Sequence, residues 1–156
     1  MWEVIKLSNT KRDTIIFEGL GFPIRLVNVQ LKKRLGEWTI DIDFDRLQLD
    51  ALHMLALKST ALSGKEIAFI IDYLKMSVRD FAKLFGVTHP AVAKWIKEEV
   101  KMNPGTEVCL RLYILNYLKV TDQEFRNLYS IITPKNLASS KKSKTPLEVT
   151  YNRLGC

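Results

Sequence analysis

Polar and charged side chains gather in a short stretch near the middle of the chain, and their types suit contacts with a nucleic acid. The stretch contains Thr88, His89, Lys94 and Lys97. If it is helical, Thr88 begins the helix and the other three residues share its free face. A lysine or a threonine can donate a hydrogen bond to guanine O6 or N7, or to a phosphate oxygen. We therefore expect this face to contact DNA, with Lys94 at a base or a phosphate and Lys97 at a phosphate.

Apolar residues in the same stretch predict the helix that holds these groups. Val92 and Trp95 lie on one stripe at helical spacing and should face the core, whereas a Trp95 that stacks on a base would have to be exposed. Thr88 is placed to cap the helix, and Pro90 lies in the first turn, where its missing N–H is tolerated. Pro90 and Ala91 can offer only apolar contacts, for example to a thymine methyl group.

A shorter helix just before this one is expected to support it. Ser77 opens a Ser-Val-Arg-Asp run, which is a capping box at a helix start. Ala82 is small enough for the two helices to cross closely, and Gly86 can leave the first helix through a left-handed conformation. This spacing is typical of a helix-turn-helix, which lays its second helix in the DNA major groove. Ser77 and Arg79 should meet a phosphate at the start of the first helix.

The same residues have an interpretation that involves no DNA. His89 and Lys94 can be solvated side chains, because most charged residues of surface helices are exposed to water. The two helices would then form a protein-interaction module that masks a partner. Only the DNA-binding hypothesis requires binding that weakens as salt rises.

Three aspartates, Asp41, Asp43 and Asp45, match the first half of a calcium-binding loop. Such a loop needs glycine at its sixth position and glutamate at its twelfth. This chain has Arg46 and Leu52 at those positions. We expect Asp43 or Asp45 to begin a helix instead, since a carboxylate stabilises the positive end of the helix dipole.

The chain has two histidines, His53 and His89, and their surroundings argue against catalysis. Neither has a cysteine or a second histidine at the spacing of a metal site. No serine or cysteine nucleophile has a histidine partner in the sequence, and no glycine-rich loop could cradle a phosphate. We therefore expect no enzyme, no catalytic residue, no metal and no cofactor.

The net charge favours an anionic partner without identifying it. The 156 residues carry a formal charge of +7. From Lys135 to the end of the chain, five basic residues oppose one acidic residue, so this segment holds +4 of that total. Its lysines at 141, 142 and 144 can touch phosphates without sequence preference, or can be solvated.

The two cysteines, Cys109 and Cys156, are expected to be free thiols in a reducing compartment. The first residues lack the apolar region of a signal peptide. No run approaches the roughly 20 apolar residues of a membrane span. We therefore expect a cytoplasmic protein without a membrane segment.

Short β-branched runs open the chain and helical patterns fill most of the rest. Strands are expected over residues 2–7, 14–17, 24–31 and 38–42, the last three as a small antiparallel region, with a polar turn at 11–13. Helices are expected over 43–58, from Ser63, from Thr106, and from Thr121 to Pro134.

These elements predict an α+β fold that is mainly α. Residues 1–60 should form an N-terminal β region and one helix, and residues 61–134 a DNA-binding domain. Residues 135–156, in which serine, lysine and proline dominate the first half, are expected to be a flexible basic tail.

Several local runs resemble the Xre/Cro, or lambda-repressor-like, helix-turn-helix family, and in particular the DNA-binding half of MqsA-like antitoxins of type II toxin–antitoxin systems. The runs are Leu62-Ser63-Gly64-Lys65-Glu66, Phe81-Ala82, Phe85-Gly86-Val87 and the pair Val92 and Trp95. The resemblance implies a lambda-repressor-like domain in a homodimer that binds a palindromic operator. It also implies a cognate toxin. The zinc of that family lies on paired N-terminal cysteines, and residues 1–60 contain none.

The motif and the resemblance together predict a sequence-specific transcriptional repressor, an antitoxin that regulates its own operon. The DNA-binding residues expected are Ser77, Arg79, Thr88, His89, Pro90, Ala91, Lys94 and Lys97. The alternative is a protein-interaction module that masks a partner without binding DNA.

Overall fold

The protein has an α+β fold, seen in a computed structural model that describes residues 9–119, 123, 126–128, 134–139 and 145–151. A mainly helical chain with N-terminal strands is therefore confirmed. The elements, in chain order, are β1 (Thr10–Phe17), β2 (Ile24–Arg34), β3 (Glu37–Ile40), α1 (Phe44–Ala56), α2 (Gly64–Tyr73), α3 (Val78–Leu84), α4 (His89–Ile96), α5 (Pro104–Tyr117), α7 (Pro134–Ser139) and β4 (Leu147–Thr150).

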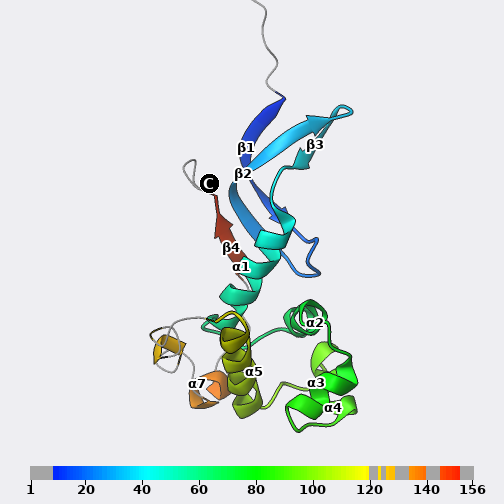
Figure 1. The fold of residues 1–156 in the computed structure, drawn as a ribbon, viewed down its shortest axis with the longest axis vertical. Helices are drawn as coiled ribbons and strands as arrows, with labels where there is room; N and C mark the ends of the chain where they lie inside the picture. Colours follow the sequence, from blue (N-terminus) through cyan, green and yellow to red (C-terminus); the bar gives the residue numbers. More distant parts are fainter. Residues whose placement is uncertain (1–8, 120–122, 124–125, 129–133, 140–144, 152–156) are drawn as a thin grey trace, which may run out of the picture.

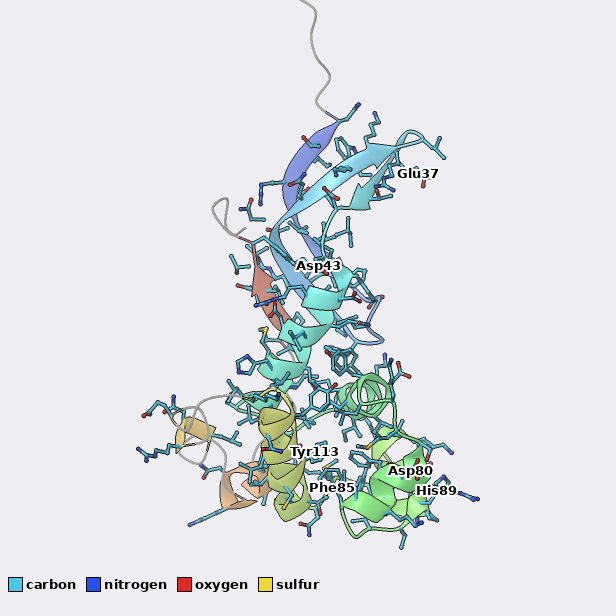
Figure 2. All side chains as sticks on the ribbon, in the orientation of Figure 1. Glu37, Asp43, Asp80, Phe85, His89 and Tyr113 are labelled. Atoms are coloured by element: carbon cyan, nitrogen blue, oxygen red, sulfur yellow. The ribbon has the colours of Figure 1, made fainter. Side chains whose placement is uncertain are left out.

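The molecule is elongated, with the sheet at one end and most helices at the other (Figure 1). Helix α1 lies between the two ends and contacts both α5 and β4. Glu37, in the β2–β3 hairpin, and His89, at the start of α4, mark the opposite ends (Figure 2). Within the described residues, no helix has the length and apolar character needed to cross a bilayer.

Strand β2 is the centre of the sheet and pairs antiparallel with β1 and β3. Both N-terminal hairpins are as expected, but β1 begins earlier than predicted. The turn predicted at residues 11–13 is wrong. This polar run continues β1, with Lys11 opposite Leu31 and Asp13 opposite Val29. A polar composition does not prevent a strand where backbone pairing with β2 satisfies its N–H and C=O groups. The strand predicted over residues 2–7 lies outside the described residues.

The expectation of a flexible C-terminal tail is wrong for two of its segments. Residues 134–139 form α7, which contacts α5, and residues 147–150 form β4. Strand β4 pairs parallel with the first half of β2, with Leu26 opposite Val149. Its side chains alternate between half-buried and exposed, as in a strand with one covered face. The composition of the serine- and lysine-rich residues before β4 predicted a tail, and the alternation of apolar residues in β4 is too short to predict a strand by itself. Residues 140–144, with the three lysines, lie outside the described part.

Asn28 links β4 to the centre of the sheet. Its φ of +57° coincides with an irregularity in the pairing of β1 and β2 between Asp13 and Ile15. Its side-chain Nδ2 donates to the Tyr151 carbonyl at 2.6 Å, and Tyr151 N donates to Val27 O at 2.8 Å. The bulged residue thus holds the chain at the end of β4.

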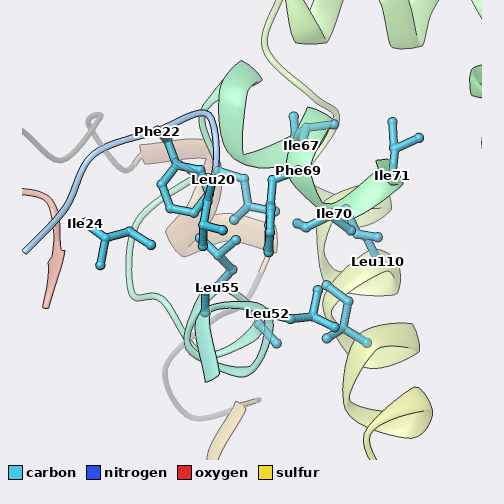
Figure 3. Close-up of a cluster of buried hydrophobic side chains, with 14 of the residues drawn as sticks. Leu20, Phe22, Ile24, Leu52, Leu55, Ile67, Phe69, Ile70, Ile71 and Leu110 are labelled. Atoms are coloured by element: carbon cyan, nitrogen blue, oxygen red, sulfur yellow. The ribbon is translucent and has the colours of Figure 1, made fainter. Parts of the chain in front are cut away.

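One buried cluster extends through both ends of the molecule and across the boundary predicted at residue 60. Leu20, Phe22 and Ile24, from the sheet end, meet Leu52 and Leu55 of α1 and several side chains of α2 and α5 (Figure 3). The Phe22 and Phe69 rings meet edge to face, with centroids 5.4 Å apart. The residues of α2 and α5 in this view are Ile67, Phe69, Ile70, Ile71 and Leu110. Sheet and helices therefore share one core.

A buried arginine, Arg111 of α5, joins α1 to the helices that follow. Its guanidinium is fully buried and donates to the carbonyls of Leu55, Lys58 and Thr60, at 3.2 Å to Leu55 and 2.6 Å to Thr60. These carbonyls lie at and beyond the C-terminal end of α1, where a helix leaves its last C=O groups without intrahelical partners. Arg111 therefore caps α1 from a distant part of the chain.

Two buried glutamates complete this network. Glu107 lies 3.5 Å from Arg111 Nη2 and accepts from Leu62 N at 2.6 Å. Glu66 pairs with Lys58 at 2.6 Å. Burial raises the pKa of Glu107 although Arg111 lowers it, and burial lowers the pKa of Arg111 although Glu107 raises it. Desolvation therefore opposes the charged form of both residues, as expected for a buried ion pair.

Three expected helix starts have different outcomes. Asp43 caps α1, with its Oδ1 accepting from Arg46 N at 3.0 Å, so the expectation of an aspartate there is confirmed. The prediction that α5 starts at Thr106 is wrong. Asn103 caps the helix, because its Oδ1 accepts from two backbone N–H groups, and Pro104 follows in the first turn. The helix expected from Thr121 lies mostly outside the described residues.

Candidate nucleic-acid interface

Residues 77–97 form the α3–turn–α4 unit, in which each helix has its own polar cap. Ser77 Oγ accepts from Asp80 N at 3.0 Å at the start of α3. Thr88 Oγ1 accepts from Ala91 N at 3.3 Å at the start of α4, and Pro90 lies in the first turn. Both N-terminal caps are confirmed, and of the capping box predicted at Ser77 it is the bond to the Ser77 hydroxyl that forms. Each hydroxyl uses only its acceptor capacity here, so its O–H can still donate to a ligand.

Gly86 ends α3 through a left-handed conformation, as predicted. Its φ is +66°, and a side chain at this position would meet nothing within 4 Å, so the backbone and not space favours glycine. Gly86 N donates to Lys83 O at 3.3 Å, and Val87 N donates to Ala82 O at 2.9 Å. These two bonds form a Schellman motif, which satisfies the last carbonyls of α3. The four residues between the helices are thereby held in a defined turn.

One side of α4 is buried against its support. Val92 is fully buried and Trp95 is 6% exposed, so the prediction that Trp95 belongs to the core is confirmed. Phe81 and Ala82 of α3 are also buried in the same cluster. The Phe85 ring meets Tyr113 of α5 edge to face, at 5.8 Å between centroids (Figure 2). The α3–turn–α4 unit is therefore fixed to α5 as well as to α2.

A close backbone approach between α2 and α4 depends on Gly64, which the sequence marked only as part of the run at residues 62–66. A Cβ at this position would lie 2.2 Å from the carbonyl oxygen of Ile96. The same Cβ would lie 2.8 Å from Glu98 Cγ. Gly64 N donates a hydrogen bond to Glu98 Oε1 at 2.8 Å. The carboxylate of Glu98 is thus directed to the start of α2. The spacing of residues within one helix could not have predicted this contact, because it joins two helices.

The other side of α4 is open to water and carries most of the predicted DNA-binding residues. Thr88, His89, Pro90, Lys94 and Lys97 are exposed, and Ala91 is half-buried. Ser77 and Arg79 are exposed at the start of α3. The fold therefore brings all eight predicted residues to the surface of one unit. His89 and Asp80 project to the same side of the molecule (Figure 2).

A shallow groove between α3 and α4 adds one cation that the sequence prediction missed. Arg79, Lys83 and His89 line it together with Asp80. Lys83 is exposed and follows Arg79 by four residues, so both lie on one face of α3. This spacing could have identified Lys83. Asp80 is the one acidic residue of the groove lining and opposes an anion at the start of α3.

Neither a metal site nor a known relative assigns a function to this surface. Among the residues that the structure describes, no three histidine, cysteine, aspartate or glutamate side chains gather closely enough to hold a metal ion. No protein-family model, curated protein or solved structure matches this chain. The physical character of the exposed face is what bears on function.

Proposed function

We propose that the protein is a sequence-specific DNA-binding regulator that places α4 in the major groove. The observation that carries this proposal is the division of α4 into two faces. Val92 and Trp95 are buried against a rigid support, whereas His89, Lys94 and Lys97 face water. A helix of eight residues is about 12 Å long and fits the major groove, which is about 12 Å wide.

In this arrangement, the start of α4 lies nearest the bases. The Thr88 hydroxyl and the His89 imidazole can bond to base edges or phosphates, and Pro90 and Ala91 offer apolar contact to a thymine methyl group. Lys94, further along the exposed face, can donate to guanine O6 or N7. Each good base contact contributes on the order of 1–3 kcal/mol of discrimination.

The cations around these residues neutralise phosphates. Arg79 and Lys83 lie on α3, and Lys94 and Lys97 lie on α4. Ser77 can donate its hydroxyl to a phosphate, whereas the carboxylate of Asp80 works against an anion at the same helix start. If all four cations reach phosphates, log K should fall with log salt with a slope of about −3 to −4 per protomer.

We further propose a lambda-repressor-like arrangement in which α2 and α5 support the two helices of the motif. The protein would act as a homodimer on two half-sites about 34 Å apart, because one short helix reads too few bases for high specificity. Resemblance to MqsA-like antitoxins supports repression of its own operon and binding of a cognate toxin. We propose a cytoplasmic protein without enzymatic activity.

Lys94→Glu tests the proposal, with Lys119→Glu as the matched control. Both lysines are exposed and both changes alter the charge equally, but Lys119 lies beyond the end of α5. We expect Lys94→Glu to abolish binding in a gel-shift assay, with duplexes selected from a random pool, and Lys119→Glu to bind like the wild type. Circular dichroism of both variants would verify the fold. If the wild type shows no salt-dependent binding to any duplex, the protein-interaction function replaces this one.

A further inference from the structure

A second cationic surface lies at the tip of the β2–β3 hairpin, at the opposite end of the molecule from α4 (Figure 2). Trp38 of β3 is 39% exposed there. Lys11 Nζ lies 4.6 Å and Lys33 Nζ 5.9 Å from the centroid of its ring. Arg34 and Leu35 follow Lys33, and Leu35 is fully exposed at the turn. We call these five residues the hairpin patch.

Strand register explains why the two lysines meet one ring. Lys33 stands directly opposite Trp38, and Lys11 stands opposite Leu31. Because Leu31 and Lys33 are two residues apart in β2, Lys11, Lys33 and Trp38 all point to the same face of the sheet. That face is covered at Leu31, which is 6% exposed, and becomes open at Lys33.

The lysines of the hairpin patch differ from Lys32 in having no acidic partner among the residues that the structure describes. Lys32 points to the opposite face and pairs with Asp41 at 2.8 Å. Two ammonium groups within 6 Å of one ring centroid repel each other, and the negative face of the indole offsets part of that repulsion. A bound phosphate would neutralise both. The ring also restricts the two side chains, which lowers the entropy lost when they bind an anion.

We propose that the hairpin patch binds the phosphate backbone of duplex DNA outside the segment contacted by α4. This inference rests on the proposed function of α4. The near end of β2 is fixed to α2 through Phe22 and Phe69, and β2 has 11 residues, so its far end lies about 36 Å further away. Strand β2 alone therefore spans about one turn of DNA, 34 Å, so the hairpin patch is too far from α2 to reach the segment that α4 contacts. Glu37 and His89 lie at opposite ends of the molecule and toward the same side of the view in Figure 2.

Two duplexes of mixed sequence, about 12 and about 40 base pairs long, separate the two surfaces, since only the longer extends more than a full turn beyond α4. The variant is Lys11→Gln with Lys33→Gln, and the control is Lys32→Gln, on the same strand but on the opposite face. On the long duplex, we expect the double variant to bind about tenfold more weakly at 0.1 M salt, with a salt slope smaller by about 2. On the short duplex, it should bind like the wild type.

Trp38→Leu provides a second measurement, because it removes the ring without changing the charge. We expect a loss of a few-fold on the long duplex with the salt slope unchanged, since both cations remain but are less restricted. Circular dichroism would confirm that this variant keeps its strands.

Four results would overturn the inference. The first two are an unchanged affinity of the double variant on the long duplex, and an equal loss of affinity on both duplexes. The third is an equal loss in the Lys32→Gln control. The fourth is a double variant that binds DNA like the wild type but no longer binds phosphatidylserine vesicles. A wild type that binds neither duplex would overturn the proposed function as well. A wild type that binds both, with an unchanged double variant, would overturn the hairpin patch alone.

Discussion

The α3–turn–α4 unit and the sheet differ in how far apart in the sequence their stabilising contacts lie. Ser77 and Thr88 each cap a helix through a backbone N–H three residues later. In the sheet, Asn28 bonds to Tyr151, 123 residues away. Local contacts leave a local pattern of residue types, whereas a contact between distant strands leaves none that one sequence can reveal.

This difference explains which predictions succeeded. The caps at Ser77 and Thr88, the glycine turn and the apolar stripe of α4 each depend on neighbouring residues, and all were confirmed, as were the hairpins of β1, β2 and β3. The parallel pairing of β4 with β2 was missed because four residues after a serine- and lysine-rich run carry too weak an alternation.

For the candidate site, the sequence located the exposed residues of α4 but not what positions the helix. Gly64 and Glu98 act across the contact between α2 and α4, and Arg111 acts between α5 and the end of α1. Each requires knowledge of which helices meet. Lys83 is the exception, since its spacing from Arg79 already places both on one face.

The largest effect on stability should come from Arg111, which joins α1, next to the sheet, to α5, next to the α3–turn–α4 unit. Arg111→Met removes hydrogen bonds to carbonyls at the end of α1 and leaves the buried Glu107 without its ion-pair partner. We expect a loss of about 3–5 kcal/mol in the free energy of unfolding. Urea denaturation followed by circular dichroism measures it. A loss below about 1 kcal/mol would show that the two regions do not depend on this link.

The pH dependence of that loss identifies its cause. Burial raises the pKa of Glu107 in the folded state, so the folded protein favours the protonated carboxyl, and stability from this group is lost as pH rises through the folded pKa. Removing Arg111 takes away the largest influence that lowers this pKa. The cost of Arg111→Met should therefore shrink as pH falls from about 8 to about 5. In the double variant with Glu107→Gln, the cost should be smaller and less dependent on pH.

Substitutions at Asn28 test the contact between distant residues in the sheet. Asn28→Gly removes the bond to Tyr151 and keeps the positive φ readily accessible, so we expect a loss of about 1 kcal/mol. Asn28→Ala keeps a Cβ in the left-handed conformation but lacks the short polar side chain that lets asparagine tolerate it, which raises the loss to about 2 kcal/mol. Amide hydrogen exchange should accelerate at residues 24–27, opposite β4, and remain unchanged in α4. Equal losses in the two variants would show that the backbone conformation contributes nothing.

Substitutions at Gly86 test the turn between α3 and α4, which depends on neighbouring residues. Gly86→Ala should cost about 1 kcal/mol because of the backbone conformation alone, since the position has open space. Gly86→Asn should cost less, because asparagine tolerates the left-handed region better. Thermal unfolding of the three proteins gives the order. An alanine variant as stable as the wild type would contradict the account of the turn.

The smallest of these losses should come from the cap of α3. Ser77→Ala removes the acceptor for Asp80 N and should cost about 0.5–1 kcal/mol. Ser77→Asp keeps an acceptor and should be nearly as stable as the wild type, but its charge should weaken DNA binding at this helix start. The comparison of denaturation midpoints with gel-shift affinities separates the structural role of Ser77 from its proposed contact with phosphate.

The most direct test is an NMR titration of the isotope-labelled protein with a short duplex that it binds. If α4 enters the major groove, the largest changes in amide chemical shift should fall on residues 88–97, with further changes at Ser77 and Arg79, and should diminish as salt is added. Unchanged shifts over residues 88–97, with changes concentrated elsewhere in the helices, would contradict the assignment of α4 as the DNA-reading helix.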